Sequence, residues 1–217
     1  MMIRPGCAWD ANEERTMNRK TFLLRLSVAA LLMVAAALAI LGCGGGVKND
    51  VAVMQTDMGT VILGFYPEVA PKTVARFKEL ASEGFYDGVL FHRVIPGFVV
   101  QSGDPKTKDP NTPPMEYGTG GSGQNLPAEF SELKHKRGTL AMARAQDPNS
   151  ADSQFYIALE ALPHLDGKYT IFGEVLKGMD VVDRIAAVET DARDVPRQPV
   201  HIISMKIVSR KEAGLDE

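Results

Sequence analysis

The stretch FHRVIPGFVVQSGD, residues 91–104, combines two short apolar strands with polar side chains in unexpected places. Pro96 and Gly97 suit positions i+1 and i+2 of a type II turn, so the segment predicts a tight hairpin. Arg93 lies within the first strand and Gln101 within the second. These two residues are either solvated edge positions or parts of a site, and the rest of the chain must distinguish the two.

The flanking sequence predicts more short strands and two helices. Residues 68–86 and 178–190 place apolar side chains on one face at helical spacing. Strands are expected within residues 51–67 (a hairpin), 138–144, 153–159, 169–175 and 199–208. In 153–159, alternation puts Phe155, Ile157 and Leu159 on one face and Gln154 and Tyr156 on the other. The pattern predicts a mainly antiparallel β-barrel with helices packed on it.

The first part of the chain has the layout of an export signal. From Met17, a basic segment precedes an apolar run over residues 26–40, and ILGC at residues 40–43 resembles a bacterial lipobox. We expect residues 1–42 to be an N-terminal extension and signal peptide with the true start at Met17. The resemblance implies a lipidated Cys43, followed by a flexible tether over 43–49. An uncleaved anchor helix and soluble secretion remain alternatives.

Composition excludes several function classes. The chain has 24 Lys and Arg against 27 Asp and Glu, and this slightly acidic balance does not favour binding to nucleic acid. Its two cysteines, Cys7 and Cys43, leave no disulfide or thiol chemistry for the globular part, and the four histidines lack metal-ligand spacing. The G-x-G-x-x-G pattern at residues 118–123 neither leaves a strand nor opens a helix, so it does not predict a nucleotide site.

Three segments together resemble the cyclophilin family of peptidyl-prolyl isomerases: FHRVIPGFVVQSGD, AMARAQDPNSADSQFYI and HLDGKYTIFGEV. The resemblance covers residues 50–209 and leaves 210–217 as a C-terminal tail. It implies a mainly β fold, a closed eight-stranded antiparallel barrel capped by two α-helices. The substrate would bind on the outer surface because the core fills the barrel.

The resemblance also implies the site residues, with no metal and no cofactor. Arg93 would be catalytic. The substrate-binding residues would be Phe98, Val99, Gln101, Ala143, Arg144, Ala145, Gln154, Tyr156, His164, Leu165 and Tyr169. His164 stands where many eukaryotic members carry Trp, and Tyr156 replaces a usual Phe. The macrocycle cyclosporin, which many members bind, is therefore expected to bind weakly.

Two function classes follow from the resemblance. The first is a monomeric isomerase acting on proline-containing polypeptides, anchored to the cell envelope through Cys43 and assisting the folding of exported proteins. The second is a chaperone or peptide-binding scaffold of the same fold with weak turnover. Retention of Arg93 favours the first. A ligand in the barrel lumen is disfavoured because the strands are apolar on both faces.

Overall fold

The structure, a computed structural model, describes residues 50–215. The predicted signal segment 1–42, Cys43 and the tether 43–49 lie outside this range. Eight strands are present: β1 (Asp50–Thr56), β2 (Gly59–Phe65), β3 (Arg93–Ile95), β4 (Val99–Ser102), β5 (Thr139–Met142), β6 (Phe155–Ala158), β7 (Ile171–Lys177) and β8 (Ile202–Ser209). The α-helices are α2 (Pro71–Ser82) and α3 (Met179–Ala186), so the mainly β prediction is confirmed. Within the described range, no helix is both long and apolar enough to cross a membrane.

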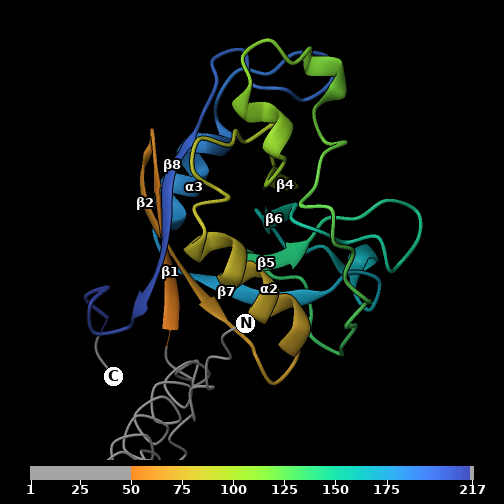
Figure 1. The fold of residues 1–217 in the computed structure, drawn as a ribbon, viewed down its shortest axis with the longest axis vertical. Coiled ribbons are helices and arrows are strands. Elements are labelled where there is room, and N and C mark those ends of the chain that lie inside the picture. The colour runs from red at the N-terminus through yellow and green to blue at the C-terminus, as the bar shows by residue number, and fades with distance from the viewer. Residues whose placement is uncertain (1–49, 216–217) are drawn as a thin grey trace, which may run out of the picture. The chain divides into compact units, whose positions relative to one another are not determined.

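The strands form one antiparallel sheet in the order β3-β4-β6-β5-β7-β2-β1-β8, which curls but stays open (Figure 1). The prediction of a closed barrel is therefore wrong. The edge strand β3 has three residues and ends at the Pro96-Gly97 turn, so it is too short to form a ladder with β8. The segment before β3 approaches the C-terminal strand instead, through an isolated bridge between Leu90 and His201 and three backbone hydrogen bonds around it.

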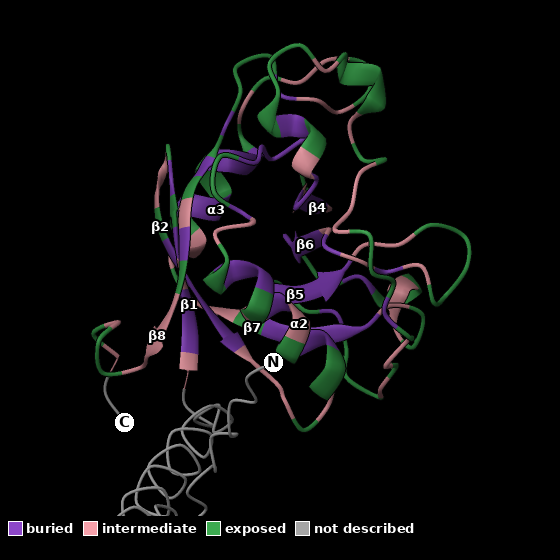
Figure 2. Cartoon of the chain, in the orientation of Figure 1, coloured by how far each residue is buried: buried purple, intermediate pink, exposed green. Residues whose placement is uncertain are grey.

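Two apolar clusters occupy opposite faces of the sheet. The large one fills the concave side, where the ring of Phe77 from α2 packs against Phe155 and Phe172. The small one includes Tyr156 and Ala158, which alternate with Phe155 and Ile157 along β6. All four β6 residues are buried, as Figure 2 shows for the strand. Alternation along the strand therefore makes a second, smaller apolar surface outside the main core.

Helix α2 ends and packs as its sequence predicts. In α2, the buried side chains are Thr73, Val74, Phe77, Leu80 and Ala81, which lie on one helical face. Gly84 follows the C-cap with a φ of +71°, its N–H donates to Ala81, and the Phe85 N–H donates to Leu80. This is a Schellman ending, in which glycine takes the left-handed conformation.

The long loop between β4 and β5 is organised by two carboxylates. Asp104 accepts hydrogen bonds from the N–H groups of Lys106, Gly118 and Gly120 at 2.8, 2.6 and 3.2 Å. Asp152 accepts in the same way from Ser122 and Gly123. A Cβ atom at Gly120 would overlap the Asp104 carboxylate. The glycine-rich pattern at 118–123 therefore wraps the protein's own carboxylates.

Candidate active site

Strand register brings the predicted polar residues into one row across the sheet. Arg93 on β3 pairs with Gln101 on β4, Gln101 pairs with Tyr156 on β6, and Tyr156 pairs with Ala141 on β5. Directly paired residues have Cβ atoms about 5 Å apart on the same face of a sheet. The hairpin turn sets this register: the Phe98 N–H donates to the Ile95 carbonyl at 3.0 Å.

A cavity of about 120 Å³ lies on this face, over the small apolar cluster. Nine of the predicted site residues line it: Arg93, Phe98, Val99, Gln101, Ala143, Arg144, Tyr156, Leu165 and Tyr169. Phe98, Val99, Tyr156, Leu165 and Tyr169 supply apolar and aromatic walls, whereas Arg93, Gln101 and Arg144 supply polar groups. The arrangement can hold a small apolar ring beside a fixed cation.

The Arg93 guanidinium is held by three different neighbours. Its Nη1 donates to Gln101 Oε1 at 3.5 Å, its Nε lies 3.9 Å from Asp194 Oδ2, and its central carbon lies 5.7 Å from the Phe98 ring centre. The side chain is 40% exposed. Since a guanidinium has five N–H donors, these contacts can orient it while donors remain for a ligand.

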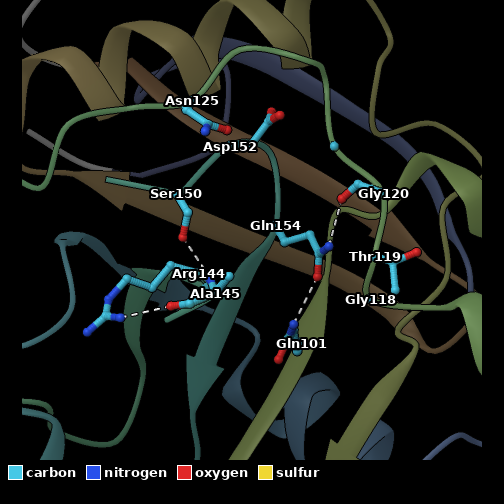
Figure 3. A pocket seen from close by; sticks show the side chains of 12 residues that line it. Gln101, Gly118, Thr119, Gly120, Asn125, Arg144, Ala145, Ser150, Asp152 and Gln154 are labelled. Atoms are coloured by element: carbon cyan, nitrogen blue, oxygen red, sulfur yellow. Dashed lines mark hydrogen bonds between the residues drawn. The ribbon is translucent and has the colours of Figure 1, made fainter. Parts of the chain in front are cut away.

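Two glutamines extend the polar row into a neighbouring pocket. Gln101 Nε2 donates to Gln154 Oε1 at 3.0 Å, and Gln154 Nε2 donates to the Gly120 carbonyl at 2.8 Å (Figure 3). This pocket, of about 430 Å³, is also lined by the predicted residues Ala143, Arg144 and Ala145. The hydrogen-bond chain gives both amides one fixed orientation. The two pockets thus share a polar wall.

His164, the remaining predicted residue, lies at the rim. Its exposed ring stacks on Phe98 with centroids 5.8 Å apart and planes at 19°. Nearby, the Arg144 guanidinium lies 4.6 Å from the centre of the Tyr169 ring and donates to the Lys168 carbonyl. The structure therefore brings all twelve predicted site residues of the described range to these two pockets and their rim.

A buried polar group lies behind the cavity. The Tyr156 hydroxyl is 2.9 Å from His135 Nε2, and His135 Nδ1 is 3.1 Å from Asp166 Oδ1. Burial raises the pKa of the Tyr156 hydroxyl and lowers the pKa of the His135 imidazole. Both groups are therefore uncharged near neutral pH.

Sequence reasoning missed several residues in and around the site, among them Asp194, Gly120 and His135. Asp194, which faces Arg93, lies in a turn with a φ of +62°, and its backbone carbonyl accepts from the Val94 N–H at 2.8 Å. Gly120 belongs to the glycine-rich pattern at 118–123, and His135 lies outside any predicted strand. Only the unusual φ of Asp194, invisible in sequence, marks it as special.

The chain is similar in sequence to known proteins. Residues 51–207 match the family model described as cyclophilin type peptidyl-prolyl cis-trans isomerase/CLD. A Brucella abortus (strain 2308) protein named as a probable peptidyl-prolyl cis-trans isomerase is 42% identical over 188 residues, covering 85% of this chain and 96% of that protein. The Schizosaccharomyces pombe peptidyl-prolyl cis-trans isomerase ppi1 is 44% identical over 157 residues, covering 69% of this chain and 94% of that protein.

A solved structure is similar as well. It is a Cryptosporidium parvum cyclophilin type peptidyl-prolyl cis-trans isomerase, crystallised in the presence of the dipeptide Ala-Pro. Its TM-score is 0.66 at 31% sequence identity, and the match covers 73% of this chain and 99% of that one.

Proposed function

Since the chain belongs to the cyclophilin-type peptidyl-prolyl cis-trans isomerase family, we propose that Arg93 stabilises the transition state for rotation about X–Pro bonds. The isomerase activity is that of the family. The assignment to Arg93 rests on one observation: its oriented guanidinium lies beside an apolar cavity of about 120 Å³. The scaffold alternative does not require a cation in that place.

The chemistry explains why a cation beside an apolar cavity suffices. Amide resonance imposes a barrier of about 18–20 kcal/mol on rotation. As the bond rotates, resonance is lost and the proline nitrogen regains a lone pair. The Arg93 guanidinium then donates a hydrogen bond to a nitrogen that is a poor acceptor in the ground state. Because this contact forms only in the transition state, it accelerates the reaction.

The remaining residues bind the substrate. The proline ring enters the cavity between Phe98, Val99 and Tyr156, where water is displaced from its apolar faces. Gln101 and Gln154 hold the peptide backbone with amides that are already oriented. The Ala-Pro dipeptide named with the Cryptosporidium parvum structure fits this assignment of substrate class.

We further propose that the enzyme acts as a monomer on exported proteins at the cell envelope, tethered by a lipid on Cys43. The support is the basic segment, apolar run and ILGC ending of residues 17–43. Several acyl chains at one cysteine anchor a protein firmly, since each buried CH₂ contributes about 0.8 kcal/mol.

A protease-coupled assay on an X–Pro peptide tests the role of Arg93. Arg93→Ala is expected to lower kcat/KM about 10²–10³-fold, the usual effect of losing one transition-state donor. Arg184→Ala is the matched control, because Arg184 is an exposed arginine on α3 paired with Asp180. Equal activity of the two variants, with unchanged circular dichroism, would exclude the proposed role.

A further inference from the structure

Tyr156 is anchored from behind by a histidine that does not touch the cavity. His135 precedes β5, its side chain is fully buried, and its ring plane is nearly parallel to that of Tyr156, at 11°. Its own backbone N–H donates to Asp166 Oδ1 at 2.8 Å, the same oxygen that faces Nδ1. The three residues thus form a line from the protein surface to the wall of the cavity.

The direction of the hydrogen bonds follows from the carboxylate. The His135 backbone N–H lowers the pKa of Asp166, which is therefore ionised and can only accept. Nδ1 of His135 must then carry the proton, and Nε2 is left as an acceptor. The Tyr156 hydroxyl has to donate to it. This arrangement satisfies the hydroxyl of a tyrosine that is only 4% exposed and belongs to the small apolar cluster.

We propose that His135 is a positioning residue: by accepting from the Tyr156 hydroxyl, it holds the tyrosine ring back as the wall of the cavity and so sets the affinity for the proline ring. The inference rests on the proposed function, which assigns this cavity to proline. A buried hydroxyl without an acceptor is unfavourable. Deprived of His135, the ring would tilt toward the water-accessible cavity that it lines.

The proposal predicts that the two residues are coupled. His135→Leu leaves the hydroxyl without its acceptor, so KM for an X–Pro peptide should rise about tenfold while kcat changes less than about twofold. Tyr156→Phe removes the hydroxyl, and in that background the acceptor is no longer needed. The double variant His135→Leu/Tyr156→Phe should therefore recover most of the lost affinity.

His201 supplies the control. It has the same local arrangement, with Nδ1 2.8 Å and its backbone N–H 2.7 Å from Asp57 Oδ2, yet it lies at the edge of β8, away from the cavity. His201→Leu in the full-length chain should leave KM unchanged. A KM for His135→Leu equal to that of this control, or a double variant no better than the single one, would overturn the proposal.

A second measurement stands even if the variants fold poorly. In wild-type protein labelled with ¹⁵N-histidine, His135 should show a protonated Nδ1 and an unprotonated Nε2. The opposite tautomer would refute the hydrogen-bond direction. Arg93→Ala separates the two ideas: if it abolishes turnover while His135→Leu changes nothing, the positioning role alone fails. If Arg93→Ala is fully active, the proposed function fails first.

Discussion

Replacing Asp104 by Asn removes the carboxylate that organises the loop between β4 and β5. This loop carries one wall of the site. The carboxylate is completely buried and accepts three backbone N–H bonds, from Lys106, Gly118 and Gly120. Asparagine has nearly the same shape, but it offers one acceptor oxygen and turns an NH₂ group toward backbone donors. At least one N–H therefore loses its acceptor, and the other bonds lose their charge.

The magnitude follows from these contacts. A hydrogen bond to a charged group contributes about 1.5–3 kcal/mol, and an orphaned buried donor costs a similar amount. Because part of the loop can take up water, we expect a loss of about 3 kcal/mol in the free energy of unfolding. For a domain of this size, that corresponds to a fall in Tm of roughly 10 °C. Since the Gly120 carbonyl orients Gln154, KM should also rise.

Thermal unfolding followed by circular dichroism measures the first effect. Asp109→Asn is the control, because Asp109 lies exposed in the same loop and accepts from the Asn111 N–H at 2.9 Å. Its Tm should change by no more than about 1–2 °C. If the Tm of Asp104→Asn equals that of Asp109→Asn, the Asp104 carboxylate does not organise the loop.

Three further outcomes are expected. His164→Trp should strengthen cyclosporin inhibition about a hundredfold, because the indole adds roughly 80 Å² of apolar contact and one hydrogen bond. A cyclosporin titration in the isomerase assay measures this, and no gain would show that His164 does not contact the drug. Cys43→Ala should abolish acyl labelling and leave an unprocessed precursor; a wild-type protein without lipid would refute the anchor. Burial lowers the pKa of the His92 and His135 imidazoles from its ordinary range, so the unfolded chain binds protons first and Tm should fall from about pH 7 to about pH 5; a flat profile would contradict this.

Local sequence rules predicted the parts of the fold that depend on neighbouring residues. The Pro96-Gly97 turn, the buried face of α2 and the alternation around Tyr156 each follow from one periodicity or one turn type, and all three are confirmed. The closed barrel failed because closure depends on the length of β3 and on bonds made by an irregular segment. Neither is encoded in a periodic pattern.

The candidate site divides in the same way. Arg93 and Gln101 could be paired from the hairpin alone, since they lie on facing strands of one turn. Asp194 and His135 could not, because each reaches the site from a distant segment whose own sequence carries no strand or helix signal. The glycine pattern at 118–123 was correctly set aside as a nucleotide site, and it resembles one because backbone N–H groups bind carboxylates and phosphates alike.

The rate of cis–trans interconversion of a peptide while it is bound tests the role of Arg93 most directly. Exchange NMR on a labelled X–Pro peptide, saturating wild type and Arg93→Ala, separates rotation from binding. The account predicts that the bound interconversion slows about 10²–10³-fold in Arg93→Ala, with the peptide's Kd changed little. An unchanged rate on the enzyme, with the whole loss appearing in Kd, would show that Arg93 holds the substrate and does not stabilise the rotating bond.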